Sequence, residues 1–372
     1  MPKKSFEMEV EPKVLEWAID SSGWKKEELL KKMKLSSKNL EAWLSGTLNP
    51  KISQLERLSQ IIRRPFAIFF LSEPQKEKPA PKDYRMLPER EGEFDKKTLL
   101  AIRRARRLQN VGKDLSHNIQ AGIKANVTNF ELKDDPKDVA DKYREELGIS
   151  DNSKQWKTPY DLFNYLRDQI EDKNILVFQI SMPIDDARGF TLTDESPEII
   201  VVNSKDKIEA RIFSLMHEFG HILLNESGIS IPENALFVNR VDAVEKWCND
   251  FASSFLLPEV KAKEIFNENK DLLIETRTLN TLSRKLKVSK AMLLYNMFKL
   301  NFISKAQYDA VLNRYRPEIL FAVEPKAKRA GFAARTADKR CVDERGHKFV
   351  SLVASNVEKG HITHNDALDY LS

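Results

Sequence analysis

The chain has 372 residues, of which 41% are hydrophobic and 31% charged, and its formal net charge at pH 7 is +5. This length predicts two to three domains, and the composition excludes a disordered chain. No apolar run reaches the ~18 residues of a membrane span and no apolar segment follows the N-terminal lysines, so we expect a soluble, unsecreted protein without a membrane partner. The two cysteines, Cys248 and Cys341, lack CxxC spacing, which indicates a reducing compartment and predicts a cytoplasmic location.

The first 74 residues carry the apolar periodicity of several short helices. The ranges with this pattern are 14–18, 27–33, 37–44 and 52–62. Ser36 or Ser37 can cap the third of these helices, and its first turn offers Ser37, Lys38 and Asn39 to an outside partner. Short helices with a tight turn and a polar first turn indicate a helix-turn-helix domain over residues 1–74.

A resemblance to a known family covers the same region. The matching stretches are Leu40-Glu-Ala-Trp43-Leu-Ser-Gly46, Pro50 and Gln54-Leu-Glu-Arg-Leu58. They resemble the Xre-type helix-turn-helix family, although Lys34 replaces its usual turn glycine and Leu44 its usual acid. The resemblance implies contact with double-stranded DNA, for which Ser37, Lys38 and Asn39 are the candidate residues. Eleven Lys and Arg against seven Asp and Glu in residues 11–72 leave a weak positive surplus, so a protein partner or internal packing stays open as the alternative.

A second segment, residues 75–130, is predicted to contain a linker and a basic helix. Residues 74–81 are rich in proline and charge, which is typical of a domain boundary. Four arginines then alternate with apolar residues over 99–115, namely Arg103, Arg104, Arg106 and Arg107. This pattern predicts an amphipathic helix with a basic outer face, which is usually only solvated, with nucleic acid or an acidic partner as the alternative.

The next segment changes from helical to extended periodicity. Helices are predicted over 139–147 and 159–170, and strands over 175–180, 188–192 and 198–203. The polar turn at 193–197 indicates that the last two strands form a hairpin. We expect a small sheet whose edge strand could align an extended peptide, and the strand ending at Asn203 is our candidate for this role.

The stretch Phe213–Leu224 contains the motif His217-Glu218-Phe-Gly-His221. On a helix, residues four apart share one face, so both imidazoles can reach one metal ion while Glu218 lies beside them as a base. The apolar neighbours predict burial of this helix. The alternative is a pair of core histidines that bond to backbone or carboxylate groups.

A catalytic zinc site needs a third protein ligand and one open position. The amphipathic helix that follows carries Glu245, our candidate ligand, with Asp242 and Asp250 as alternatives. Asn249 lies one turn after Glu245, where it could hydrogen-bond a ligand imidazole. Cys248 is expected to pack as a small hydrophobic residue.

A second family resemblance spans this region. It is carried by Arg188-Gly-Phe, Ile199-Ile-Val-Val-Asn203, Ala210–Leu224, Glu245-x-x-Cys-Asn249-x-Phe-Ala252 and Leu256-Leu-Pro258. These stretches resemble the ImmA/IrrE family of metallopeptidases, which often carries an Xre-type module in front. The resemblance implies a zincin-like, gluzincin-type domain over 131–315 with Zn²⁺ held by His217, His221 and Glu245 and with Glu218 as base. Family members tend to have alanine at the position of Cys248.

These features together predict a regulatory zinc endopeptidase. Its expected substrate is a specific protein, because known members of the resembled family cleave transcriptional repressors, and the gene of such a regulator could lie nearby. The alternative is a DNA-binding regulator whose zinc domain acts as a sensor with little or no proteolysis. An oxyanion partner is normally also needed, and spacing alone does not choose between Tyr295 and Arg284.

The remainder is predicted to be helical. A helical pair over 279–300 is itself similar to a helix-turn-helix, but its apolar stripe favours packing against the zinc helices. Residues 316–372 are expected to form a small accessory region that opens with a loop at 324–331 and ends in a helix. His361 and His364 lie three apart there without an evident third metal ligand. The predicted fold class is therefore α+β and mostly helical.

Overall fold

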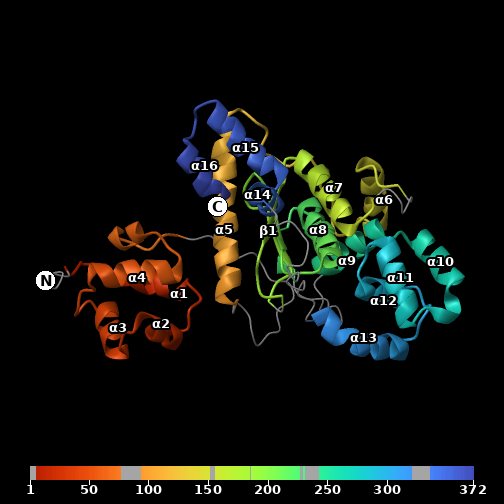
Figure 1. The fold of residues 1–372 in the computed structure, drawn as a ribbon, viewed down its shortest axis with the longest axis horizontal. Coiled ribbons are helices and arrows are strands. Elements are labelled where there is room, and N and C mark those ends of the chain that lie inside the picture. Colours follow the sequence, from red (N-terminus) through yellow and green to blue (C-terminus); the bar gives the residue numbers. More distant parts are fainter. Residues whose placement is uncertain are drawn as a thin grey trace. The chain divides into compact units, whose positions relative to one another are not determined.

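The computed structural model describes residues 6–76, 94–150, 156–184, 186–226, 229–230, 243–320 and 336–372 (Figure 1). The chain divides into two compact units. The first unit holds the short N-terminal helices and the start of helix α5 up to Arg103, and the second holds the chain from Arg104 onward. The described residues are mainly helical with one small sheet in the second unit, which confirms the coarse α+β prediction.

Short helices form the first unit around one apolar core. They are α1 (Pro12–Asp20), α2 (Lys26–Met33), α3 (Ser37–Leu44), α4 (Ile52–Ile62), the 3-10 helix η1 (Phe66–Phe70) and the start of α5 (Lys96–Asn118). The apolar periodicity placed the first four within one or two residues of these bounds. Leu40 and Trp43 of α3 and Leu55 and Leu58 of α4 are all buried in this core.

The turn between α2 and α3 explains one departure from the Xre pattern. Lys34 ends α2 with a φ of 55°, the left-handed conformation that glycine adopts without steric cost. Ser36 then caps α3, because its side chain accepts a hydrogen bond of 3.3 Å from the backbone N–H of Asn39. The lysine therefore keeps the backbone geometry that a glycine would provide.

The second unit contains the sheet and the remaining helices. Its strands are β1 (Leu176–Ile180), β2 (Gly189–Leu192), β3 (Ile199–Asn203) and β4 (Ile229–Ser230). Its helices are α6 (Pro136–Glu146), α7 (Pro159–Asp172), α8 (Ile208–Leu223), α9 (Ala243–Leu256), α10 (Glu259–Glu268), η3 (Lys270–Leu272), α11 (Thr276–Leu286), α12 (Lys290–Lys299), α13 (Lys305–Leu320), α14 (Ala337–Arg345), α15 (His347–Glu358) and α16 (His364–Leu371).

The strands are ordered β1-β3-β2-β4. β1 runs parallel to β3, while β2 is antiparallel to β3, with Phe190 opposite Val201, so the predicted hairpin is confirmed. β4 pairs with the start of β2, where Ser230 lies opposite Gly189. The expectation that the strand ending at Asn203 aligns a peptide is wrong, because β3 lies between two strands and its backbone groups are already paired.

Helices cover both faces of the sheet, so β1, β2 and β3 are buried along their whole length. On one face Val177 and Val202 join the core that contains α7, α8 and α9. On the other face the ring of Phe178 meets that of Phe349 from α15 edge to face, with centroids 5.4 Å apart. Burial on both faces accounts for the nearly continuous apolar runs that identified these strands in the sequence.

The last helices pack onto this framework. Met292, Leu293 and Met297 of α12 are buried in a second core, and Asn296 hydrogen-bonds Ser253 of α9, so the predicted packing role of 279–300 is confirmed. Helices α14, α15 and α16 make up most of residues 337–371, while the expected loop at 324–331 lies outside the described residues. In the described part of the chain, no helix is both long and apolar enough to cross a bilayer.

Candidate functional site

Helix α8 carries the histidine motif through the centre of the second unit. Nearly all its side chains are buried, because β2 and β3 lie on one side of the helix and α7 and α9 on others. Arg211 anchors its first turn through hydrogen bonds of 2.8 Å to the carbonyl oxygen of Asp206 and 3.0 Å to Oε1 of Gln179 on β1. The motif is thus held on a rigid element whose start is fixed to the sheet.

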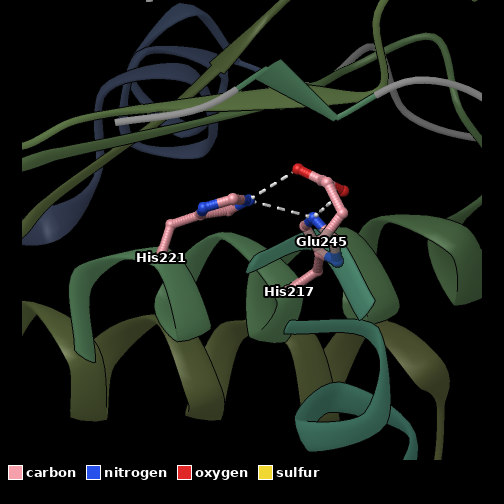
Figure 2. A group of neighbouring side chains, drawn as sticks. All are labelled: His217, His221 and Glu245. Carbon is pink, nitrogen blue, oxygen red and sulfur yellow. Dashed lines mark hydrogen bonds and ion pairs between the residues drawn. The ribbon is translucent and has the colours of Figure 1, made fainter. Parts of the chain in front are cut away.

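The structure brings three of the predicted site residues together. The Nε2 atoms of His217 and His221 are 3.2 Å apart, and the carboxylate oxygens of Glu245 lie 3.3 Å from the first and 3.1 Å from the second. Figure 2 shows the two rings rising from successive turns of α8 toward the carboxylate that comes from α9. All three side chains are 0% exposed. Among the described residues, this is the group of histidine, cysteine and acidic side chains whose geometry could hold a metal ion.

The donor set fits a zinc ion. Ligand atoms about 2.0–2.1 Å from one ion at tetrahedral angles lie roughly 3.3 Å from each other, which is close to the distances observed here. Two imidazoles and one carboxylate are also the donor types that catalytic zinc accepts. Burial of such polar groups side by side costs free energy that an ion would offset.

Cys248 lies beside this cluster and is a buried free cysteine. Burial raises the pKa of its thiol, so the neutral thiol is favoured. Gly220 allows this close packing, since a Cβ there would lie 3.2 Å from the sulfur of Cys248. Cys248 therefore packs as expected from the sequence.

Glu218, the predicted base, faces β2 and is also 0% exposed. Thr191 donates a hydrogen bond of 2.7 Å from its hydroxyl to Oε2 of Glu218. Gly189 leaves room for the carboxylate, because a Cβ there would lie 2.9 Å from Oε1 of Glu218 and 2.8 Å from the carbonyl oxygen of Val201. Neither the role of Thr191 nor the space at Gly189 was predicted from the sequence, although two residues spaced two apart on one strand share a face.

A buried polar network fixes the strand above Glu218. Arg188, the residue before β2, donates to Asp206 at 2.6 Å, and both side chains are almost fully buried. Asn203 uses its amide to bind the main chain at Met182 and Ala187, with distances of 2.8–3.2 Å. These contacts hold the ends of β2 and β3, and neither Asp206 nor the bonds of Asn203 were foreseen from the sequence.

Other sequence candidates lie elsewhere in the structure. Asp250 forms an ion pair with Lys299, and Asp242 lies outside the described residues. Arg284 is exposed and Tyr295 is half-buried on α12, so the choice between them as an oxyanion partner stays open. Asn249 is buried beside the site, yet its Nδ2 has no hydrogen-bond partner within the described residues, so its predicted bond to a ligand imidazole stays a prediction.

The polar candidates outside the site also differ in their surroundings. Ser37, Lys38 and Asn39 are exposed on the first turn of α3. In the second unit, Arg106 pairs with Asp194 and Arg107 with Asp369, so these arginines of the basic helix serve internal contacts. His361 and His364 are exposed and belong to no metal-competent group among the residues described.

A comparison with known families places this geometry in context. Residues 170–298 match the model of a peptidase family described as the IrrE N-terminal-like domain. This match supports the ImmA/IrrE family. It runs from the end of α7 into α12 and so includes the sheet, α8 and α9, but it covers less than half of the chain and leaves the first unit outside. No curated protein and no solved structure matches the chain.

Proposed function

We propose that the second unit is a zinc-dependent endopeptidase. The observation that carries this proposal is the convergence of Glu245 from α9 on His217 and His221 from α8, with the buried Glu218 adjacent to His217 in the same helix. The family match supports a peptidase, and the buried group of three can bind a metal. Zinc is the ion that this donor set favours.

The chemistry of the residues follows from their positions. When bound by His217, His221 and Glu245, zinc would supply Lewis-acid chemistry, which activates water and polarises a peptide carbonyl. Glu218 would take the proton of the attacking water and return it to the nitrogen of the departing amine. The dry, preorganised surroundings of this carboxylate strengthen its electrostatic action.

We propose a specific regulatory protein, such as a transcriptional repressor or antitoxin-like regulator, as the substrate. The match to the IrrE N-terminal-like domain and the presence of a separate helical unit in front of the peptidase unit support this class of substrate. A sensor in which the metal has no hydrolytic role is the alternative. Glu218 argues against it, since metal binding alone does not require a carboxylate at this position.

The experiment compares the wild-type chain with Glu218→Gln, using zinc-loaded protein and the purified regulator encoded beside its gene. We expect the variant to retain zinc and to lose cleavage by about 10²–10⁴-fold, because it lacks the base. Glu209→Gln, which alters another carboxylate of α8, is the matched control and should cleave like the wild type. Equal cleavage by Glu218→Gln would refute the peptidase proposal and favour the sensor.

We further propose that the first unit contacts double-stranded DNA through the first turn of α3. Ser37, Lys38 and Asn39 are exposed there, whereas the comparable turn from α11 to α12 leads into a helix that is mostly buried. A helix must present free polar side chains to read a groove. The exposed turn of α3 meets this requirement, and the buried α12 does not.

A further inference from the structure

Strand β2 presents two small residues to the helix that carries the motif. Because side chains alternate along a strand, Gly189 and Thr191 share one face while Phe190 and Leu192 share the other. Gly189 lies against the carboxylate of Glu218, and Thr191 bonds to it. The face of β2 toward α8 is therefore shaped around one side chain.

The hydroxyl of Thr191 has two acceptors on the same residue. Its Oγ1 lies 2.7 Å from Oε2 of Glu218 and 3.2 Å from the carbonyl oxygen of Glu218. A hydroxyl has one proton to donate, and a carboxylate is the stronger acceptor. The shorter distance identifies the carboxylate as the main partner. If Thr191 needed only a partner for its buried hydroxyl, the backbone carbonyl oxygen of Glu218 would be enough. The shorter bond to the carboxylate is therefore an additional contact.

The surroundings leave the Glu218 carboxylate little freedom. Its other oxygen lies beneath Gly189, and the backbone at Val201 closes the space behind that glycine. The ion pair between Arg188 and Asp206 fixes the beginning of β2, so strand β2 cannot shift easily away from the carboxylate. Thr191 and Gly189 thus act on the side chain from a rigid strand.

We propose that Thr191 is a positioning residue for the general base. Its hydroxyl holds Oε2 of Glu218, and this contact keeps the carboxylate on the β2 side of α8 while the proton is taken and returned. This inference rests on the proposed peptidase function and adds to it a residue outside the metal-binding set. A group that orients a reacting side chain typically contributes a factor of 10–100 to activity.

The first test measures kcat, KM and zinc content for Thr191→Val and Thr191→Ser. Valine keeps the branched shape but removes the donor, so kcat should fall about 10–100-fold with KM and bound zinc unchanged. Serine keeps the hydroxyl and should restore most of kcat. Thr98→Val is the matched control, because Thr98 is buried in α5 and its hydroxyl has no partner within the described residues. A wild-type kcat in Thr191→Val, or an equal loss in Thr191→Ser, would overturn the proposal.

The second test does not depend on activity. Thr191→Val should lower the urea midpoint of the zinc-free protein more when Glu218 is present than in a Glu218→Met background, where only the 3.2 Å bond to the carbonyl oxygen of residue 218 remains to be lost. The same shift in both backgrounds would refute the contact. If the wild type shows no Glu218-dependent cleavage, the peptidase proposal fails instead, and the two failures are distinct.

Discussion

Glu171→Gln tests whether a buried carboxyl makes the stability of the second unit depend on pH. Glu171 lies on α7 and is 2% exposed. Its Oε2 accepts a hydrogen bond of 3.0 Å from the backbone N–H of Lys348 in the first turn of α15. The N-cap residue of α15 is Gly346, and a Cβ there would collide with the Glu171 carboxylate. Glu171 thus takes the place of a capping side chain.

The magnitude follows from the pKa of this group. Burial raises the pKa of Glu171 from 4.5 to about 7, although the charge of Arg167 opposes the shift. Between these two values the folded protein holds a proton that the unfolded chain releases, so the free energy of unfolding falls as pH rises from 4.5 to 7. At about 1.4 kcal/mol per pKa unit, the full loss above pH 7 is about 3 kcal/mol.

The assay is urea unfolding of both proteins at several values from about pH 4.5 to about pH 8. Glutamine cannot ionise but can still accept the hydrogen bond from Lys348. The free energy of unfolding of the variant relative to wild type should therefore rise by about 3 kcal/mol across this range. Glu145→Gln, at an exposed position of α6, serves as the control. A difference between Glu171→Gln and wild type that does not change with pH would refute this reasoning.

Two further predictions concern the strand above the base and the first unit. Gly189→Ala would place a methyl group 2.9 Å from Oε1 of Glu218. We therefore expect the free energy of unfolding in urea to fall by about 1–3 kcal/mol and cleavage to become much weaker. Wild-type stability together with wild-type cleavage would contradict this packing. Lys38→Ala should reduce the salt dependence of DNA binding in a shift assay, by about one unit in the slope of log affinity against log salt, whereas Lys13→Ala on α1 should not. Absence of any binding at low salt would exclude the DNA role.

Local periodicity predicted much of the fold. The strand and helix ranges agreed with the structure within a few residues, because alternation and 3.6-residue spacing reflect which faces are buried. The same spacing placed His217 and His221 on one face of α8. The order of the strands was harder to predict, since parallel pairing of β1 with β3 depends on contacts between distant segments. Because the strand order could not be predicted, the peptide-aligning role was assigned to β3, which is an interior strand.

For the charged residues too, the local pattern predicted the helix but not the long-range partners. Four arginines on one helix indicated a basic face, but the acids that pair with Arg106 and Arg107 are Asp194 and Asp369, which lie far away in sequence. Helical spacing contains no information about such partners. Only the folded chain could show that these charges form ion pairs with one another, and the pair of Arg107 and Asp369 lies at the surface of the second unit.

The sequence by itself determined the chemistry available to this protein, because the spacing in His217-Glu218-x-x-His221 directs two imidazoles to one side of any helix that contains it. The tertiary structure decided how that chemistry is held. Packing of α9 against α8 brings Glu245 to the histidines, and packing of β2 above α8 places Thr191 against the carboxylate of Glu218. These contacts join segments far apart in the chain, so they follow from the packing of elements and not from the local pattern of any one of them.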